Sequence, residues 1–236
     1  MKIPGVAVTI APLSTGSASM YDHFTDFDRH RLVIARQDAA SGLSAIIAIH
    51  DETLGPAMGG CRILNYPRPD LAVTDVLRLS RGMTYKNAIA NIPYGGGKAV
   101  IIADPASAKT TGLLHAMGDF VQSLGGRYIT SFDSGTTLED VRTIGERTQF
   151  AAGTLPAAGN ASASTANGIY HCMRAAADLV HGSSSLGGMT VAIQGVGNVG
   201  RRLAERLADD GASLIIADTD AATAATVAER TGASIV

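Results

Sequence analysis

The sequence predicts an α/β protein with two domains, an N-terminal α/β domain over residues 1–152 and a partial Rossmann (doubly wound) domain over residues 153–236. Short apolar runs alternate along the chain with segments of helical period, which is the pattern of α/β folds. Residues 153–163 change to Gly, Pro, Asn and Ala without periodicity, as in a link between domains. Beyond that link, the motif GVGNVG stands between a strand pattern and a helix pattern. This arrangement is typical of a dinucleotide-binding βαβ unit.

The composition indicates a globular protein with a small-molecule partner. The 236 residues are 46% hydrophobic and 17% charged, which suits one large core or two modest ones. The formal net charge of -2 and the absence of a basic run argue against nucleic acid and anionic membranes, because both need clustered Lys and Arg. No apolar run reaches the roughly 18 residues that span a bilayer. We therefore expect no nucleic-acid partner and no membrane partner.

The N-terminus and the cysteines favour a soluble, cytoplasmic protein. Residues 1–19 carry one Lys, and Pro4 and Pro12 bracket too few apolar residues for a signal peptide. We expect a loose tail or an edge strand there. Cys61 and Cys172 are far apart and lack the spacing of metal ligands, so we interpret them as reduced thiols and expect no metal site.

In the first domain, apolar runs and helical periods predict three strands and three helices. The strands are expected at 45–50, 99–103 and 128–132, and the helices at 71–91, 113–124 and 137–147. Residues 54–61, LGPAMGGC, are expected to form a glycine loop, and the triple glycine before Lys98 places this lysine where a loop meets a strand. Asp133 follows the last strand at its carboxyl end, where open α/β sheets place groups that handle ligands.

In the second domain, the pattern predicts a helix at 165–180 and then a βαβ unit. Its strand, helix and second strand are expected at 189–194, 201–210 and 213–217, with a third strand starting at 233–236. The glycine motif of this unit consists of Gly195, Val196, Gly197, Asn198, Val199 and Gly200.

The glycine motif and Asp218 predict a site for NAD. The first glycine permits the tight turn, the second lets the backbone approach a pyrophosphate, and the third lets the helix pack on the strand. Asp218 ends the second strand, where a carboxylate accepts hydrogen bonds from the ribose hydroxyls and repels a 2'-phosphate, so NAD is favoured over NADP. The alternative is a glycine turn that binds no nucleotide; the strand, the helix and Asp218 all argue against it.

Two of the four lysines stand in unusual contexts, Lys86 in GMTYKN and Lys98 in GGGK. Arginine supplies most of the other basic side chains, so a lysine at these positions favours chemistry in which the group loses its proton. The alternative, a pair of solvated surface lysines, is the ordinary expectation for lysine and fits poorly beside a triple glycine.

Four stretches together resemble the amino-acid dehydrogenase superfamily, most closely its leucine/valine dehydrogenase branch. They are AIIAIHDETLGPAMGGCRI, GMTYKNAIANIPYGGGKAVIIADP, YITSFDSGTTLED and GNASASTANGIY. The resemblance runs from about residue 45 to residue 218. It implies an N-terminal substrate domain, a C-terminal Rossmann domain and an active site in the cleft between them.

The resemblance also implies the catalytic roles. Lys86 would bind the substrate α-carboxylate, Lys98 would be the base that acts through a water, and Asp133 would exchange a proton with the substrate amine. The implied reaction transfers hydride from Cα to NAD and gives an imine, which water hydrolyses to a 2-oxo acid and ammonia. Lys98 would then work well below its ordinary pKa of about 10.4, and both a second cation and a dry cleft would lower this pKa.

The remaining implied residues concern the substrate and the nicotinamide. Gly59 and Gly60 resemble the glycines that line the substrate floor, and Thr165 resembles the threonine that bonds the nicotinamide carboxamide. In glutamate enzymes a lysine occupies the place of Met58, whereas a thioether offers only an apolar wall, so an aliphatic or aromatic substrate is favoured.

The chain departs from the family in three places. Residues 161–165 lack the usual prolines, and Ser134 replaces the usual valine. The third departure is length: a doubly wound domain has about six strands, so on the order of 100 residues are expected to be missing after Val236. An uncovered sheet edge would then invite association, and we expect a homo-oligomer.

Three alternatives remain open at the level of sequence. One is a phenylalanine-type dehydrogenase. Another is a truncated, non-catalytic product that binds only substrate or a partner. The third is an unrelated NAD-binding regulator, in which Lys98 would have no role.

Overall fold

A computed structural model describes residues 6–7, 24–152 and 161–236, which form two compact units, 1–156 and 157–236. We call them unit 1 and unit 2 and describe each by itself. Most of the predicted tail at 1–19 and of the predicted link at 153–163 lies outside the described residues, so the domain boundary after residue 152 stays a prediction. Over the described ranges, no helix is long and apolar enough to cross a membrane.

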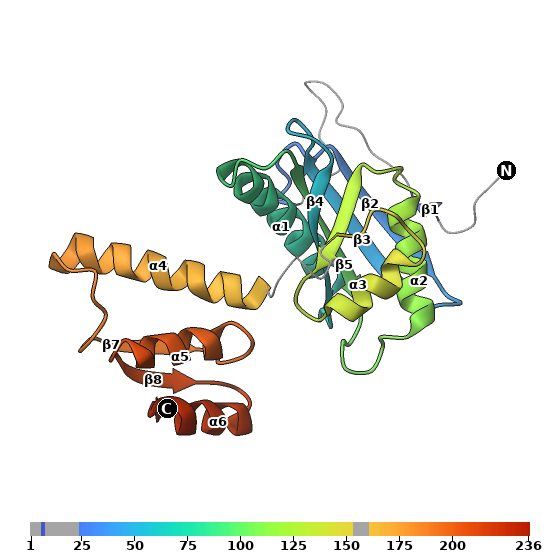
Figure 1. Cartoon of the computed structure of the whole chain (residues 1–236). Helices are drawn as coiled ribbons and strands as arrows, with labels where there is room; N and C mark the ends of the chain where they lie inside the picture. The colour runs from blue at the N-terminus through green and yellow to red at the C-terminus, as the bar shows by residue number, and fades with distance from the viewer. Residues whose placement is uncertain (1–5, 8–23, 153–160) are drawn as a thin grey trace. The chain divides into compact units, whose positions relative to one another are not determined.

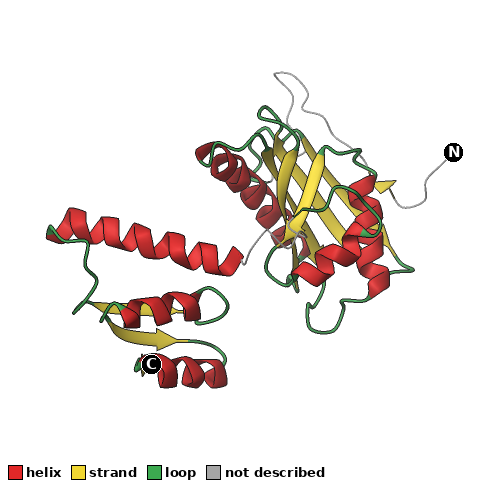
Figure 2. Cartoon of the chain, in the orientation of Figure 1, coloured by secondary structure: helices red, strands yellow, loops and turns green. Residues whose placement is uncertain are grey.

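Unit 1 is built on one mixed sheet of six strands in the order β1-β2-β3-β5-β4-β6 (Figure 2). The strands are β1 Val6–Ala7, β2 Leu32–Asp38, β3 Leu43–Asp51, β4 Ala57–Leu64, β5 Gly95–Ile102 and β6 Tyr128–Phe132. From β1 to β5 the neighbours in the sheet run antiparallel, whereas β4 lies parallel to both β5 and β6. The carboxyl ends of β4, β5 and β6 therefore meet at one edge of the sheet.

Three helices cover the sheet of unit 1, with α1 Pro69–Ile89 on one face and α2 Thr111–Gln122 and α3 Leu138–Gly145 on the other (Figure 1). The apolar run of β3 serves both faces: Ile46 packs into the core under α1, and Ile47 into the core under α2 and α3. A strand buried on both faces has no polar side to alternate with, which explains its continuous apolar sequence.

The strands predicted at 45–50, 99–103 and 128–132 and the helices predicted in this unit are confirmed, with ends that differ by a few residues. The predicted glycine loop at 54–61 is wrong, because residues 57–64 form β4 between β5 and β6. The triple glycine belongs to β5, so Lys98 lies inside this strand and not where a loop meets it. Strand β2 was not predicted.

These glycines are needed because neighbouring elements approach the strands closely. A Cβ on Gly59 would lie 1.8 Å from the carbonyl oxygen of Gly97, and a Cβ on Gly96 would lie 2.0 Å from Oγ1 of Thr84 on α1. Both distances are far below contact, so the glycines allow β4 to pair with β5 and α1 to pack directly on β5. Their conformational permissiveness suggested a loop, but here it is their lack of a side chain that matters.

Unit 2 is a βαβαβ arrangement that follows one long helix. Its elements are α4 Ala161–His181, β7 Thr190–Gln194, α5 Gly200–Asp209, β8 Ser213–Ala217, α6 Ala221–Thr231 and β9 Ser234–Ile235. The three strands are parallel in the order β7-β8-β9, and α5 packs against both α4 and α6. The predicted βαβ unit and the third strand are confirmed, and α4 begins before the predicted residue 165. Unit 2 is thus Rossmann-like.

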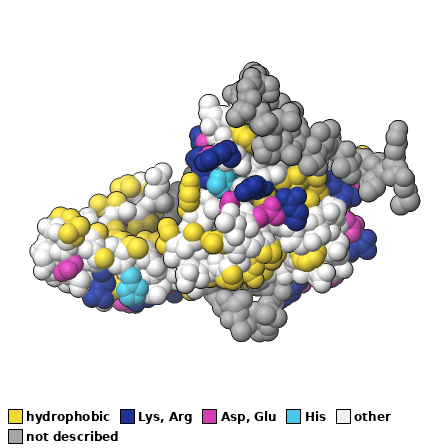
Figure 3. Space-filling view, turned by 90° about the horizontal axis from the view of Figure 1, so that it is seen from above, with side chains coloured by type: hydrophobic (Ala, Val, Ile, Leu, Met, Phe, Trp, Pro, Cys, Tyr) yellow, Lys and Arg dark blue, Asp and Glu magenta, His cyan; other side chains and the backbone are white. Residues whose placement is uncertain are grey.

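On the face drawn in Figure 3, Lys and Arg side chains lie interspersed with Asp and Glu side chains. Ion pairs in unit 1 join segments that are distant in the sequence, such as Arg127 with Glu52 and Lys109 with Asp140. This mixed pattern gives the drawn face no extended field of a single sign.

Candidate functional site

A buried lysine and a half-buried aspartate form an ion pair on the sheet of unit 1. Lys98 in β5 places Nζ 2.9 Å from Oδ2 of Asp133, the residue that follows β6. Strand β4 lies between β5 and β6, so the Asp133 side chain has to reach across it. Gly60 of β4 makes this possible, since a Cβ there would lie 2.8 Å from Cβ of Asp133.

A hydroxyl fixes the turn that carries Asp133. Thr136 accepts a hydrogen bond from the backbone N–H of Asp133 at 2.8 Å, and its hydroxyl lies 2.8 Å from the carbonyl oxygen of Cys61, to which it donates. Gly135, with φ +79°, provides the left-handed residue of this turn, where a Cβ would lie 2.0 Å from the carbonyl oxygen of Ile63. The turn therefore holds Asp133 against β4.

Burial and charge act in opposite directions on this pair. Burial lowers the pKa of Lys98, whose exposed fraction is 5%, and the positive charge of Arg62 lowers it further, while Asp133 acts to raise it. The net pKa of Lys98 lies below the ordinary lysine value. Burial alone would raise the pKa of Asp133, but Lys98 and Arg62 outweigh burial and the net pKa is lowered. The site thus combines an ionised carboxylate with a lysine that gives up its proton more readily than a solvated one.

Arg62 extends the pair into a network that sequence reasoning missed. Its Nε donates to Oδ2 of Asp133 at 2.9 Å, and its Nη1 donates to Asp75 of α1 at 2.8 Å. Tyr66 donates its hydroxyl to the same Asp75 oxygen at 2.6 Å. The available signal was a charged residue between Cys61 and Ile63, directly after the predicted glycine loop at 54–61.

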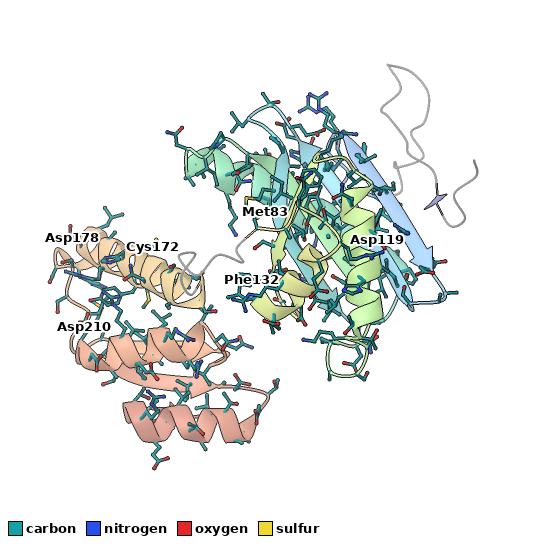
Figure 4. The ribbon with its side chains drawn as sticks, turned by 45° about the vertical axis from the view of Figure 1, so that its right-hand side comes forward. Met83, Asp119, Phe132, Cys172, Asp178 and Asp210 are labelled. Atoms are coloured by element: carbon teal, nitrogen blue, oxygen red, sulfur yellow. The ribbon has the colours of Figure 1, made fainter. Side chains whose placement is uncertain are left out.

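The structure does not bring Lys86 into the buried pair. Lys86 is exposed in the last turn of α1. It lies three residues after Met83, so the two share a helix face, and Cγ of Met83 lies 3.3 Å from the position of a Cβ on Gly59. Met58 is half-buried in β4. Figure 4 labels Met83 on α1 and Phe132 at the end of β6.

The glycine motif of unit 2 forms the turn between β7 and α5. Gly195 has φ +89°, and a Cβ on Gly200 would lie 2.0 Å from the carbonyl oxygen of Gly195, so both positions require glycine. A Cβ on Gly197 would meet nothing within 4 Å, which leaves its backbone open to a ligand. Of the remaining members of the motif, Val196 is buried and Asn198 is exposed.

Asp218 closes the same site from the end of β8. Its Oδ2 accepts the backbone N–H of Val196 at 2.7 Å, and its Oδ1 accepts the N–H of Asp220 at 2.9 Å. These two bonds keep the pKa of Asp218 below its usual value. An open glycine turn, the first turn of α5 and a fixed carboxylate fit the pyrophosphate and ribose of a dinucleotide. Thr165 is exposed on α4, and Val199 is the residue before α5 begins.

The fold and the two sites define a class: an α/β protein with a Rossmann-like dinucleotide turn in one unit and, in the other, an aspartate paired with a buried lysine. A family model described as "Glu/Leu/Phe/Val dehydrogenase, dimerisation domain" matches residues 30–152. A second, described as "Glutamate/Leucine/Phenylalanine/Valine dehydrogenase", matches residues 159–233. The chain belongs to the Glu/Leu/Phe/Val dehydrogenase family, which confirms the resemblance found in the sequence.

Individual relatives agree with this assignment. A leucine dehydrogenase of Bacillus subtilis is 46% identical over 92% of this chain, and a valine dehydrogenase of Streptomyces virginiae is 48% identical over 82% of it. Among solved structures, an L-tryptophan dehydrogenase from Nostoc punctiforme has a TM-score of 0.62 at 46% identity, with 88% of this chain covered. The chain spans 60%, 55% and 59% of the length of these three proteins.

Proposed function

We propose that this protein is an NAD-dependent dehydrogenase that oxidatively deaminates an apolar L-amino acid of the leucine/valine type to a 2-oxo acid and ammonia. The observation that carries the proposal is the buried contact between Lys98 and Asp133, in a chain of this family. In this proposal residues 1–152 bind the substrate and supply the catalytic groups, and residues 153–236 bind the cofactor.

The proposed steps use the side chains of unit 1 in sequence. NAD, held by the glycine turn of unit 2, would supply the chemistry of a hydride acceptor for the substrate Cα. Lys86 would pair with the α-carboxylate, Asp133 would exchange a proton with the amine, and neutral Lys98 would take a proton from the water that attacks the imine carbon. A base with a lowered pKa suits this last step near neutral pH.

Asp218 supports NAD over NADP. Its carboxylate is held at the end of β8 beside the glycine turn, where it would accept the ribose hydroxyls and repel a 2'-phosphate. Thr165 is proposed to form a hydrogen bond with the nicotinamide carboxamide. Gly197 is proposed as the glycine that the pyrophosphate approaches most closely, because space is open around it.

The apolar substrate class is supported by Met58 and by the relatives. Leucine, valine and tryptophan enzymes are all about equally identical to this chain, so both aliphatic and aromatic side chains occur among them. Gly59 and Gly60 would form the substrate floor. We further propose a homo-oligomer, since the family model of residues 30–152 is described as a dimerisation domain. A cytoplasmic location is also part of the proposal.

Replacement of Lys98 by Met in the full-length protein tests the proposal. Met keeps most of the buried volume and removes the base, so turnover with leucine should fall by a factor of about 1,000 or more while the fold is retained. The measurement is NADH or NADPH formation by absorbance with leucine, valine, phenylalanine and glutamate, with circular dichroism as the check on folding. Undiminished turnover in the folded variant would refute the role of Lys98. A preference for phenylalanine would point to the phenylalanine-type alternative, and a preference for glutamate would refute the role of Met58.

A further inference from the structure

One oxygen of Asp133 is shared by two cations. Nζ of Lys98 and Nε of Arg62 each lie 2.9 Å from Oδ2. Among the described residues, Oδ1 has no hydrogen-bond partner, so the second oxygen is available to a ligand. The two carboxylate oxygens of Asp133 therefore differ: Oδ2 is held by both cations, whereas Oδ1 is free to bind a ligand.

Arg62 is itself held from the far side. Its Nη1 donates to Asp75 of α1, and Tyr66 donates to the same oxygen of Asp75. The guanidinium thus bridges a helix and the turn after β6 with two different nitrogens. A planar, permanently charged fork can make both bonds at once, which the single ammonium of a lysine cannot do with the same geometry.

The charge balance at Asp133 explains the role of Arg62 as a second cation beside Lys98. When Lys98 gives up its proton, it no longer balances the charge of the half-buried Asp133 carboxylate. Without another cation, Asp133 would then be an unpaired, half-buried charge and would have a stronger tendency to take up a proton itself. Arg62 stays charged at every relevant pH, so it keeps Asp133 ionised in both protonation states of Lys98.

We propose that Arg62 is a positioning residue of this site, which holds the Asp133 carboxylate ionised and in place while Lys98 loses and regains its proton. The catalytic part of this inference rests on the proposed function, whereas the electrostatic part does not. Three ionisable groups face Lys98. They are Asp133, which follows β6, and Cys61 and Arg62, which lie on β4. Its register partner on β3 is the apolar Ala48, and α1 contributes Asp75 through Arg62.

Titration of Lys98 by NMR tests the electrostatic part without requiring turnover. With the ε-carbon of lysine labelled, the chain gives signals from only four lysines, and Lys→Arg variants assign them. In Arg62→Gln, loss of the neighbouring positive charge should raise the pKa of Lys98 by about one unit or more. The signals of Lys86 and Lys109 serve as internal controls.

Three further variants separate positioning from support of the fold. Arg62→Lys restores the positive charge and should keep the titration midpoint of Lys98 near that of the unmodified protein. Its kcat should nevertheless be about tenfold lower than that of the unmodified protein, because the bridge to α1 is lost. Asp75→Asn removes a negative charge from behind Arg62 and should move the midpoint slightly lower. Arg78→Gln, on an exposed arginine of α1 paired with Asp26, is the matched control and should change neither quantity.

The outcomes distinguish the two claims. A Lys98 midpoint that is unchanged in both Arg62→Gln and Asp75→Asn would overturn the inference, even if turnover fell. If Arg62→Gln does not fold, the Asp75→Asn midpoint decides alone. A shifted midpoint in a protein that shows no turnover with any amino acid would leave the role of Arg62 standing and refute the proposed function instead.

Discussion

Lys98 shows how a single side chain depends on its surroundings for its chemistry. A solvated lysine is protonated at neutral pH, but burial in β5 and the nearby guanidinium of Arg62 both lower the pKa of Lys98. Asp133 opposes them and holds the ammonium in place. The balance allows the proton to leave without the side chain losing its position.

Lys86 gives a prediction that contrasts with Lys98. Because Lys86 is exposed on α1, its replacement by Ala should leave the fold intact and weaken substrate binding. Loss of a charge-assisted bond to a carboxylate costs about 1.5 to 3 kcal/mol, so KM for the amino acid should rise roughly 10- to 150-fold with a smaller change in kcat. Steady-state kinetics measure both. The control is Arg68→Ala, at the other end of the same helix; an unchanged KM in Lys86→Ala would contradict the carboxylate role.

His30 gives a prediction about stability rather than activity. It is 1% exposed, its Nδ1 accepts the backbone N–H of Asp28, and its Nε2 lies 3.1 Å from the carbonyl oxygen of Leu77. This arrangement fits a neutral ring that donates from Nε2. Burial lowers the pKa of His30 from 6.5 to about 4, despite the carbonyl of Leu77 and the carboxylate of Asp28.

The sign of the pH dependence follows from that shift. Between pH 6.5 and about 4 the unfolded chain binds a proton that the folded chain does not, so unit 1 should lose stability as the pH falls through this window, by up to about 3 kcal/mol. Urea unfolding at several pH values measures the loss. His30→Gln keeps a donor and cannot titrate, so much of the slope should disappear, with a remainder from His50, whose pKa burial also lowers. An equal slope in the variant would show that His30 is not responsible.

At the scale of elements, the packing of α1 on β5 decides the geometry of the site. Helix α1 carries Asp75 and Lys86, and β5 carries Lys98. Gly96 lies where the helix approaches the strand most closely, since a Cβ there would lie 2.0 Å from Oγ1 and 2.2 Å from the backbone nitrogen of Thr84. The absence of one side chain thus fixes the distance between two functional elements.

Two glycine replacements test this packing as a matched pair. Gly96→Ala should destabilise unit 1 by at least about 3 kcal/mol, because the backbone of α1 would have to move. Gly82→Ala places the same methyl group in α1 where nothing lies within 4 Å, and it should stabilise the helix by about 0.5 to 1 kcal/mol. Urea denaturation measures both changes. A Gly96→Ala protein as stable as the unmodified one would show that α1 packs less closely than the structure indicates.

For the whole molecule, the two units differ in how deeply their sheets are buried. Seven of the eight residues of β5 are buried, whereas three of the five residues of β7 and both residues of β9 are exposed. Unit 2 has its own core, which includes Val196, Leu207 and Ile216. The strands of unit 2 nonetheless have a smaller share of buried residues than the strands of unit 1.

This difference predicts unequal local stability. In hydrogen–deuterium exchange, amides of β3 and β5 should be protected far longer than amides of β7 and β9, because exposed strands open without loss of a large core. Peptide-level mass spectrometry gives the comparison within one sample, so unit 1 is the internal standard. Equal protection in both units would mean that the strands of unit 2 are covered in solution, as an oligomer could do.

The sequence by itself determined the α/β class, the βαβ unit with its glycine turn, and the family. These features depend on local patterns: the apolar run of β3, the helical period of α2, and the glycines at 195 and 200 that a tight turn and a close packing contact require. The family motifs also brought Lys98 and Asp133 to attention. Such patterns can be recognised in the sequence because each one involves only residues that are close together along the chain.

Only the tertiary structure decided which distant residues meet. The glycines at 59, 60 and 96 were interpreted as loop residues because sequence does not show that a strand or a helix presses against them. Arg62 was missed for the same reason: its partners, Asp75 and Asp133, lie 13 and 71 residues away along the chain. Parallel pairing of β4 with β5 and β6 brings these charges together, and burial there sets the pKa of Lys98. Both effects depend on long-range packing, which local sequence patterns do not encode.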